Sequence, residues 1–272
     1  LYIGDTPDQP TLTDQFEGYM DEIRFSNGIA RWTAGFVVET AAYTADVYTL
    51  LLLHCDGSDG GTTFTDSSTT SGGRHTIFAN GDVANTRAVR KIGDSSIAFD
   101  GSGDYLSLDD SSTFKLGDTS ASWTIEFWIR LTSAAADYII IDHRASTIAN
   151  GGFSFYTDVS EGGVGFDRSN GTTWGAALQD PTQNTLDTWY HYAVVQDGGS
   201  TLKMYRDGTE VDSTTTLMDD DSGTYINWFI GGGFNSSGSH SNNYYMNGYL
   251  DEIRVSDSAR YTSAFTPQTT QF

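Results

Sequence analysis

The chain contains an internal repeat, and its two copies limit how the chain can be divided into domains. Residues 18–26 read GYMDEIRFS, and residues 248–256 read GYLDEIRVS. Self-similarity of this kind is typical of proteins built from repeated units. Because the second copy lies near the end of the chain, we predict that the first copy is also the end of a unit. Residues 1–45 are therefore expected to be the C-terminal remnant of a preceding repeat with a linker, and residues 46–272 to form one complete domain.

The remnant carries apolar residues without the sheet that should cover them. Tyr19, Ile23 and Phe25 fall in its strand-like segment, and two strands alone are only marginally stable in water. We expect the remnant to dock on a neighbouring sandwich, either on the adjacent face of the complete domain in the same chain or on another copy, which would receive its strands by strand addition. Neighbouring repeats are thus expected partners, and a homo-oligomer is one possible assembly.

Apolar residues in the second unit alternate with a period of two. In the segment 123–131, Ile125, Phe127 and Ile129 fall on one face of an extended strand. Short runs of this kind recur between turn dipeptides such as Asp207-Gly208, and no segment sustains the periodicity of a helix. The 30 glycines and 4 prolines suit many strands joined by tight turns. The sequence therefore predicts an all-β protein with two packed antiparallel sheets.

Charge and cysteine content exclude several classes of protein. The formal charge of −22 would repel nucleic-acid phosphates and anionic lipid surfaces, so no nucleic-acid partner is expected. No apolar run approaches the roughly 18 residues that a membrane-spanning helix needs, so no membrane span is expected. The single cysteine, Cys55, permits no disulfide within the chain. We predict that it is a small buried residue and not a nucleophile.

Six segments of the second unit follow one another as in a known family. They are LLLHCDG at 51–57, IAFDGSGDYL at 97–106, WTIEFWIR at 123–130, WYHYAVV at 189–195, MYRDG at 204–208 and GYLDEIR at 248–254. In these motifs the chain resembles the laminin-G-like branch of the concanavalin A-like lectin/glucanase superfamily. The resemblance implies an antiparallel two-sheet jelly-roll sandwich. The tail ARYTSAFTP is most similar to copies found in phage and environmental bacterial structural proteins.

This fold serves several functions, so function has to be argued from the site. The leading hypothesis is a non-enzymatic carbohydrate-binding or adhesion module of a tandem-repeat protein that is extracellular, at the cell surface or on a virion, in a tail or fibre. Its partners would be cell-surface or extracellular glycans. The alternative is a purely structural, protein-contacting repeat of a fibre or filament. A third hypothesis is an inactive relative of the jelly-roll glucanases.

No catalytic residues are expected. Retaining glucanases place two carboxylates on one sheet face about 5 Å apart, and no Glu-x-Asp-x-Glu pattern occurs in this chain. Glu126 stands alone on its strand, and Glu252 has only Asp251 beside it, on the opposite face. The sequence therefore predicts a protein that is not an enzyme.

An acidic residue is expected on the apolar face of the last strand. Every second residue of a strand shares a face, so Asp251 is predicted to point the same way as Ile253 and Val255. A buried carboxylate requires an arginine, backbone N–H groups or a cation. In several members of the family that the chain resembles, a similarly placed acid joins a structural calcium with groups near the first strand. The resemblance implies such a calcium site at Asp251 and Asp56, with the oxygen ligands that calcium prefers; the alternative is a salt bridge.

Sugar sites combine aromatic rings that stack on pyranose faces with groups that hydrogen-bond hydroxyls. The segments 234–245 and 170–174 offer both kinds of side chain, and His143 lies beside Arg144 near an expected turn. The candidate ligand-binding residues are Trp174, Asn170, His143, Asn235, Asn242, Asn243, Tyr244 and Tyr245.

Overall fold

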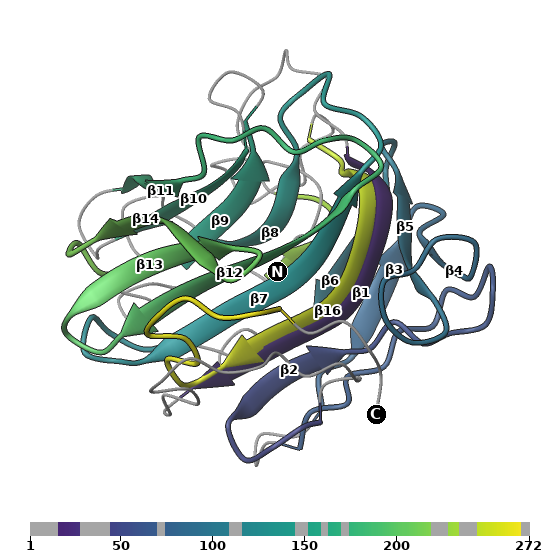
Figure 1. Ribbon diagram of the computed structural model, residues 1–272. Helices are drawn as coiled ribbons and strands as arrows, with labels where there is room; N and C mark the ends of the chain where they lie inside the picture. Colours follow the sequence, from purple (N-terminus) through teal and green to yellow (C-terminus); the bar gives the residue numbers. More distant parts are fainter. Residues whose placement is uncertain are drawn as a thin grey trace.

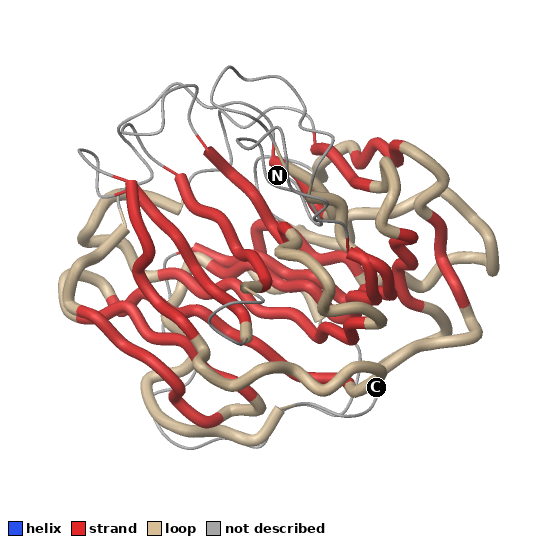
Figure 2. Tube along the Cα trace, turned by 90° about the horizontal axis from the view of Figure 1, so that it is seen from above, coloured by secondary structure: helices blue, strands red, loops and turns tan. Residues whose placement is uncertain are grey.

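The computed structural model describes residues 16–27, 44–69, 74–108, 116–144, 152–158, 163–169, 174–218, 228–233 and 244–267. These residues form strands and loops without a helix, as Figures 1 and 2 show. The strands make two sheets, and every pairing except that of β1 with β16 is antiparallel. The predicted all-β jelly-roll sandwich is confirmed, whereas nothing in the structure tests the domain boundaries, which stay a prediction.

The larger sheet has nine strands in the order β14-β13-β12-β7-β1-β2-β16-β5-β4. Their bounds are β1 Phe16–Asn27, β2 Thr49–Leu53, β4 Ala84–Thr86, β5 Ser96–Asp100, β7 Trp123–Leu131, β12 Trp189–Asp197, β13 Thr201–Arg206, β14 Thr209–Thr214 and β16 Asn247–Ser256. The smaller sheet has seven strands in the order β11-β10-β9-β8-β15-β6-β3. Their bounds are β3 Ile77–Asn80, β6 Tyr105–Leu108, β8 Ile139–Arg144, β9 Gly152–Thr157, β10 Val164–Ser169, β11 Trp174–Gln179 and β15 Trp228–Ile230.

The core lies between the two sheets and follows the predicted alternation. Ile125, Phe127 and Ile129 of β7 point inward and have no exposed surface. The ring of Phe127 meets that of Phe155 from the smaller sheet edge-on at a centroid distance of 5.3 Å. Cys55 is buried as well, which confirms the prediction that it is a buried residue. Burial of this aromatic and aliphatic surface is the main force that joins the sheets.

The face of the nine-stranded sheet that is turned away from the core is called the outer face below. Part of it is covered by residues 257–267, which follow β16. Within this covering segment, the rings of Tyr261 and Phe265 stack at 3.7 Å, and Phe265 packs on Tyr205 of β13. The backbone N–H of Phe265 donates to the Gly208 carbonyl at 2.7 Å. The covering segment is thereby fastened to the turn between β13 and β14.

A β-bulge in β16 overturns the expected facing of Asp251. The register with β7 shifts between Asp251 and Arg254, and Glu252 adopts a left-handed conformation with φ of +48°. An inserted residue reverses the alternation beyond it. Asp251 therefore lies on the outer face opposite Trp128, while Ile253 belongs to the core. The prediction that Asp251 shares a face with Ile253 and Val255 was wrong for this reason.

The two copies of the repeat lie side by side. Strand β1 runs parallel to β16, purple beside yellow in Figure 1. Their register follows the repeat, since Tyr19 is level with Tyr249 and Ile23 with Ile253.

Candidate functional site

Several of the expected ligand-binding residues fall where little can be said of them. Asn170, Asn235, Asn242 and Asn243 lie outside the described residues. Trp174 is the first residue of β11, at the edge of the smaller sheet. For these residues the sequence-based expectation stays a prediction.

The structure corrects the interpretation of the other three candidates, His143, Tyr244 and Tyr245. His143 has no exposed surface, and its ring stacks on Trp228 at 4.4 Å inside the sandwich. Tyr244 and Tyr245 are only 5% and 7% exposed. A ring without an open face cannot stack on an external sugar, so these side chains contribute to packing. The sequence suggested otherwise because a polar residue near a turn is usually at the surface.

A row of three half-buried side chains crosses the outer face where the covering segment leaves it open. Trp189 of β12 pairs with Arg130 of β7, and Arg130 pairs with Tyr249 of β16. The guanidinium carbon of Arg130 lies 5.1 Å from the centre of the Tyr249 ring. The rings of Trp189 and Tyr249 approach to 6.5 Å at 54°. We call these three residues the aromatic row.

A fourth side chain completes this surface. Asp187 forms an ion pair of 2.7 Å with Arg130, and its own side chain is 64% exposed. Its backbone N–H donates to the Leu131 carbonyl at 2.8 Å, and its φ of +59° is uncommon for a residue other than glycine. The carboxylate is therefore held beside the aromatic row by a constrained loop, where it remains open to solvent.

The aromatic row has the chemistry that carbohydrate recognition needs. Ring faces pack against the C–H face of a pyranose, while a guanidinium donates and a carboxylate accepts hydrogen bonds with its hydroxyls. Sequence reasoning missed this site, although the alternation of β7 did place Arg130 on the face opposite the core. The information that was lacking is the register that aligns Trp189 and Tyr249 on either side of it.

The two acids expected to bind calcium both contact the segment that precedes β5. Asp251 is buried, and its Oδ2 accepts the backbone N–H groups of Lys91 and, at 2.7 Å, of Ile92. Burial raises the pKa of the Asp251 carboxyl well above its usual range, although these two hydrogen bonds oppose the change. Asp56 accepts the N–H of Asp94 at 2.6 Å. Backbone groups thus supply hydrogen bonds to both carboxylates.

A polar cavity of about 150 Å³ adjoins Asp56, and its lining includes Thr63, Ser67 and Asn85. The Asn85 amide donates to the carbonyls of Gly61 and Thr63, while its buried Oδ1 has no hydrogen-bond partner among the described residues. Carboxylate, amide and hydroxyl oxygens are ligands that calcium accepts. The residues around Asp56 therefore fit a calcium ion, but Asp251 does not line this cavity. Calcium at Asp56 and Asp251 stays a prediction.

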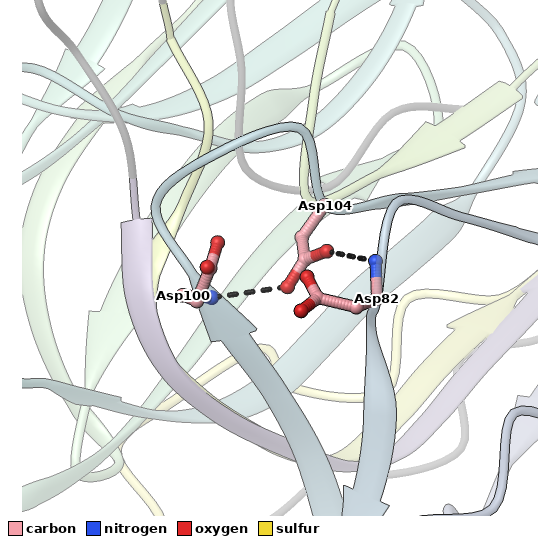
Figure 3. Close-up of side chains that lie close together, drawn as sticks. All are labelled: Asp82, Asp100 and Asp104. Carbon is pink, nitrogen blue, oxygen red and sulfur yellow. Dashed lines mark hydrogen bonds between the residues drawn. The ribbon is translucent and has the colours of Figure 1, made fainter.

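Three further acids converge at the turn between β5 and β6. The carboxylates of Asp82, Asp100 and Asp104 lie within 4.8 Å of one another (Figure 3). Asp104 is 2% exposed, and it accepts the N–H groups of Asp82 at 2.8 Å and Asp100 at 3.1 Å. Burial, joined by the negative charge of Asp100, raises the pKa of Asp104 to about 7.

This raised pKa makes stability depend on pH. Between about pH 4 and about pH 7 the unfolded chain releases the Asp104 proton while the folded chain keeps it, so the free energy of unfolding falls as pH rises. The loss attributable to Asp104 is expected to be at most about 4 kcal/mol across this window. Urea unfolding at a series of pH values should therefore give a flatter profile for Asp104→Asn than for the natural chain. Parallel profiles would contradict the assignment.

Comparisons with known proteins agree with this architecture. A family model described as the concanavalin A-like lectin/glucanases superfamily, of laminin-G type, matches residues 100–263. No curated protein sequence matches the chain.

Several solved structures are similar to parts of the chain at low identity. The receptor-binding domain of botulinum neurotoxin C/D mosaic serotype has a TM-score of 0.48 and 15% identity, over 68% of this chain and 42% of that one. A heptameric SAP-like pentraxin from Limulus polyphemus has a TM-score of 0.35 and 15% identity, over 53% and 71%. The CBM40 of Ruminococcus gnavus IT-sialidase, bound to α2,3 sialyllactose, has a TM-score of 0.37 and 16% identity, over 46% and 71%. The match to the neurotoxin domain spans less than half of that domain's length.

Proposed function

The chain belongs to the concanavalin A-like lectin/glucanase superfamily, and from this premise we propose that it is a non-enzymatic carbohydrate-binding module whose site is the aromatic row. One observation carries the proposal. Two aromatic rings flank an arginine that is paired with an exposed carboxylate, on a part of the outer face that the covering segment leaves open.

The proposed ligand is a glycan whose pyranose ring packs on Trp189 and Tyr249. Arg130 would donate to its hydroxyls or to an acidic substituent, and Asp187 would accept from hydroxyls. The three row residues project from adjacent paired strands, so little conformational entropy is lost when a ligand binds. A rigid sheet surface of this kind suits recognition because the contacts are positioned in advance.

The absence of hydrolysis is part of the proposal. Glu126, the acid that shares the outer face with Arg130, is completely buried. Its carboxylate is bonded to Arg254 and to the Tyr261 hydroxyl of the covering segment. A nucleophile or general acid must reach the substrate, so Glu126 is unsuited to either role.

The setting proposed for this module is extracellular, at the cell surface or on a virion, within a tandem-repeat adhesion or fibre protein. The acidic balance, with a formal charge of −22, suits a soluble exposed surface. Among the described residues, no helix has the length and hydropathy needed to span a membrane.

We expect Trp189→Ala and Tyr249→Ala each to weaken glycan binding at least tenfold, because each removes one stacking surface. Arg130→Met should weaken it to a similar degree by removing the donor. The measurement is a glycan array on the natural chain, followed by titration calorimetry of each variant with the best ligand.

The matched control for these variants is Phe78→Ala, which removes an aromatic ring that is 51% exposed on β3 of the other sheet. It should leave affinity unchanged. An array without any bound glycan, run both with calcium and with chelator, would reject the proposal in favour of the purely structural repeat. Equal losses for Phe78→Ala and Trp189→Ala would reject the aromatic row as the site.

A further inference from the structure

A polar cavity lies where the chain leaves β2. Strand β2 ends at Leu53, and the residues at positions 54–57 enclose a volume of about 150 Å³ together with Asn85 of β4 and residues of the segment 63–67. Asp56 carries the single carboxylate among the described residues of this lining, which include neither lysine nor arginine. A cavity of this size has room for several water molecules, or for an ion with part of its hydration shell. We call it the β2 cavity.

The side chain of Asn85 is held in one orientation at this cavity. It is 2% exposed, and its Nδ2 donates to the carbonyls of Gly61 at 2.9 Å and of Thr63 at 3.2 Å. The backbone N–H of Asn85 donates to the Gly61 carbonyl at 2.8 Å, and its carbonyl accepts the N–H of Gly60 at 2.8 Å. An amide side chain has its donors at one end and its acceptor at the other. Because the donors face two carbonyls, the Oδ1 atom is fixed as an acceptor.

This Oδ1 atom is buried, and it has no hydrogen-bond partner among the described residues. Buried polar atoms in folded proteins are normally satisfied by protein groups, ordered water or ions, because an acceptor that is removed from water without a partner is costly. The Asn85 Oδ1 therefore points to a bound group at the β2 cavity, and this group has to be a hydrogen-bond donor or a cation.

The same oxygen lies beside the turn that carries Asp56. A Cβ on Gly57 would lie 2.8 Å from the Asn85 Oδ1, so the amide packs directly on the backbone of the residue that follows Asp56. This turn is held by Ser95, whose hydroxyl accepts the Gly57 N–H at 2.8 Å. The Asp56 carboxylate accepts the N–H of Asp94 at 2.6 Å. A positioned carboxylate and a positioned amide oxygen thus line one cavity.

We propose that the β2 cavity is a calcium site, in which Asp56 supplies the negative charge and the Asn85 Oδ1 supplies a neutral oxygen. Calcium accepts about six to eight oxygen ligands in flexible geometry, and carboxylate, amide, hydroxyl and water oxygens all serve. Ser67 lines the cavity and offers a hydroxyl, and water completes the shell. Magnesium demands a near-ideal octahedron, so calcium is the better match to a wide cavity with few protein ligands.

This set of ligands differs from the pair of Asp56 and Asp251 that the family resemblance implies. Asp251 does not line the β2 cavity, and its Oδ2 accepts the backbone N–H groups of Lys91 and Ile92. In the proposed site Asn85 takes its place. A single carboxylate neutralises only part of the charge of calcium, so the affinity should be low. The expected dissociation constant is on the order of 10⁻⁴–10⁻³ M, the range of extracellular calcium modules.

The test is a calorimetric titration of calcium chloride into the full chain after treatment with chelator, with magnesium chloride in a parallel titration. The natural chain should bind calcium saturably and magnesium more weakly. Asp56→Asn should weaken calcium binding at least tenfold. Asn85→Asp should tighten it, because this change adds a second carboxylate to the site. A residue with a merely structural role would not give that gain.

The matched control is Asp59→Asn. Asp59 is exposed, as Asp56 is, and it also accepts a backbone N–H, that of Arg87 at 2.8 Å, but it does not line the cavity. This variant should keep the calcium affinity of the natural chain, and so should Asp251→Asn.

Thermal melting in calcium and in chelator gives a second readout. Calcium should raise the melting temperature of the natural chain by a few degrees, because it binds only the folded state, and it should not raise that of Asp56→Asn. The proposal is overturned if the natural chain shows no saturable binding up to about 10 mM calcium. It is also overturned if Asp59→Asn weakens binding as much as Asp56→Asn does, or if Asp251→Asn abolishes it.

Discussion

Glu126→Gln is expected to lower the free energy of unfolding by about 3–5 kcal/mol, the usual cost of breaking a buried ion pair. The Glu126 carboxylate is fully buried and bonded to Arg254 and to the Tyr261 hydroxyl. His191 Nε2 lies 3.3 Å from one of its oxygens and Arg260 Nε 3.7 Å from the other. Burial opposes ionisation, but the interactions with His191 and Arg260 outweigh it and hold the pKa of Glu126 below its usual value. The neutral amide would remove the negative charge that faces the buried guanidinium groups of Arg254 and Arg260.

The measurement is urea unfolding followed by tryptophan fluorescence. The matched control is Asp187→Asn, which neutralises the partner of Arg130 in an ion pair open to solvent. Exposed ion pairs contribute about 0–1 kcal/mol, so the control should remain close to the natural stability. A loss below about 1 kcal/mol for Glu126→Gln would show that the buried network does not depend on its negative charge.

Gly208→Ala is expected to cost about 3 kcal/mol, at the upper end of the range for overpacking. Gly208 has a φ of +76°, and a Cβ there would lie 1.7 Å from the Phe265 carbonyl oxygen. The backbone of the covering segment would have to move away, which would break the 2.7 Å hydrogen bond between Phe265 and Gly208. The stacked rings of Tyr261 and Phe265 would then be released from the outer face.

Gly199→Ala is the control for Gly208→Ala, because Gly199 has a φ of +72° and open space around its would-be Cβ. It carries only the cost of a left-handed alanine, about 1 kcal/mol. Thermal melting gives the difference between the two variants, and limited proteolysis should cut the covering segment faster in Gly208→Ala alone. Equal effects of the two substitutions would mean that the collision with Phe265 is relieved without cost.

The sequence predicted those features that depend on neighbouring residues along the chain. The alternation of Ile125, Phe127 and Ile129 identified an inward face, because successive side chains of a strand point to opposite sides. The dipeptide Asp207-Gly208 indicated a tight hairpin, and both residues have positive φ in the structure. Repeated segments of this kind, taken in order, were enough to predict the sandwich and the family.

The orientation of the Asp251 side chain could not be predicted from the local sequence. A strict period of two placed it with Ile253, but the left-handed conformation of Glu252 inserts a bulge between them. The groups that satisfy the Asp251 carboxylate are the backbone amides of Lys91 and Ile92. Every residue type except proline carries such an amide, so no sequence pattern marks this partner.

The sequence by itself determined the strands, their inward faces and the turns, because each is set by the conformational preferences of adjacent residues. The tertiary structure alone decided that Trp189, Arg130 and Tyr249 form one row, and that Asp251 lies on the outer face. These arrangements depend on the register between strands that are distant in the chain. Register is chosen by the burial and hydrogen bonding of the whole sheet, which no short segment encodes.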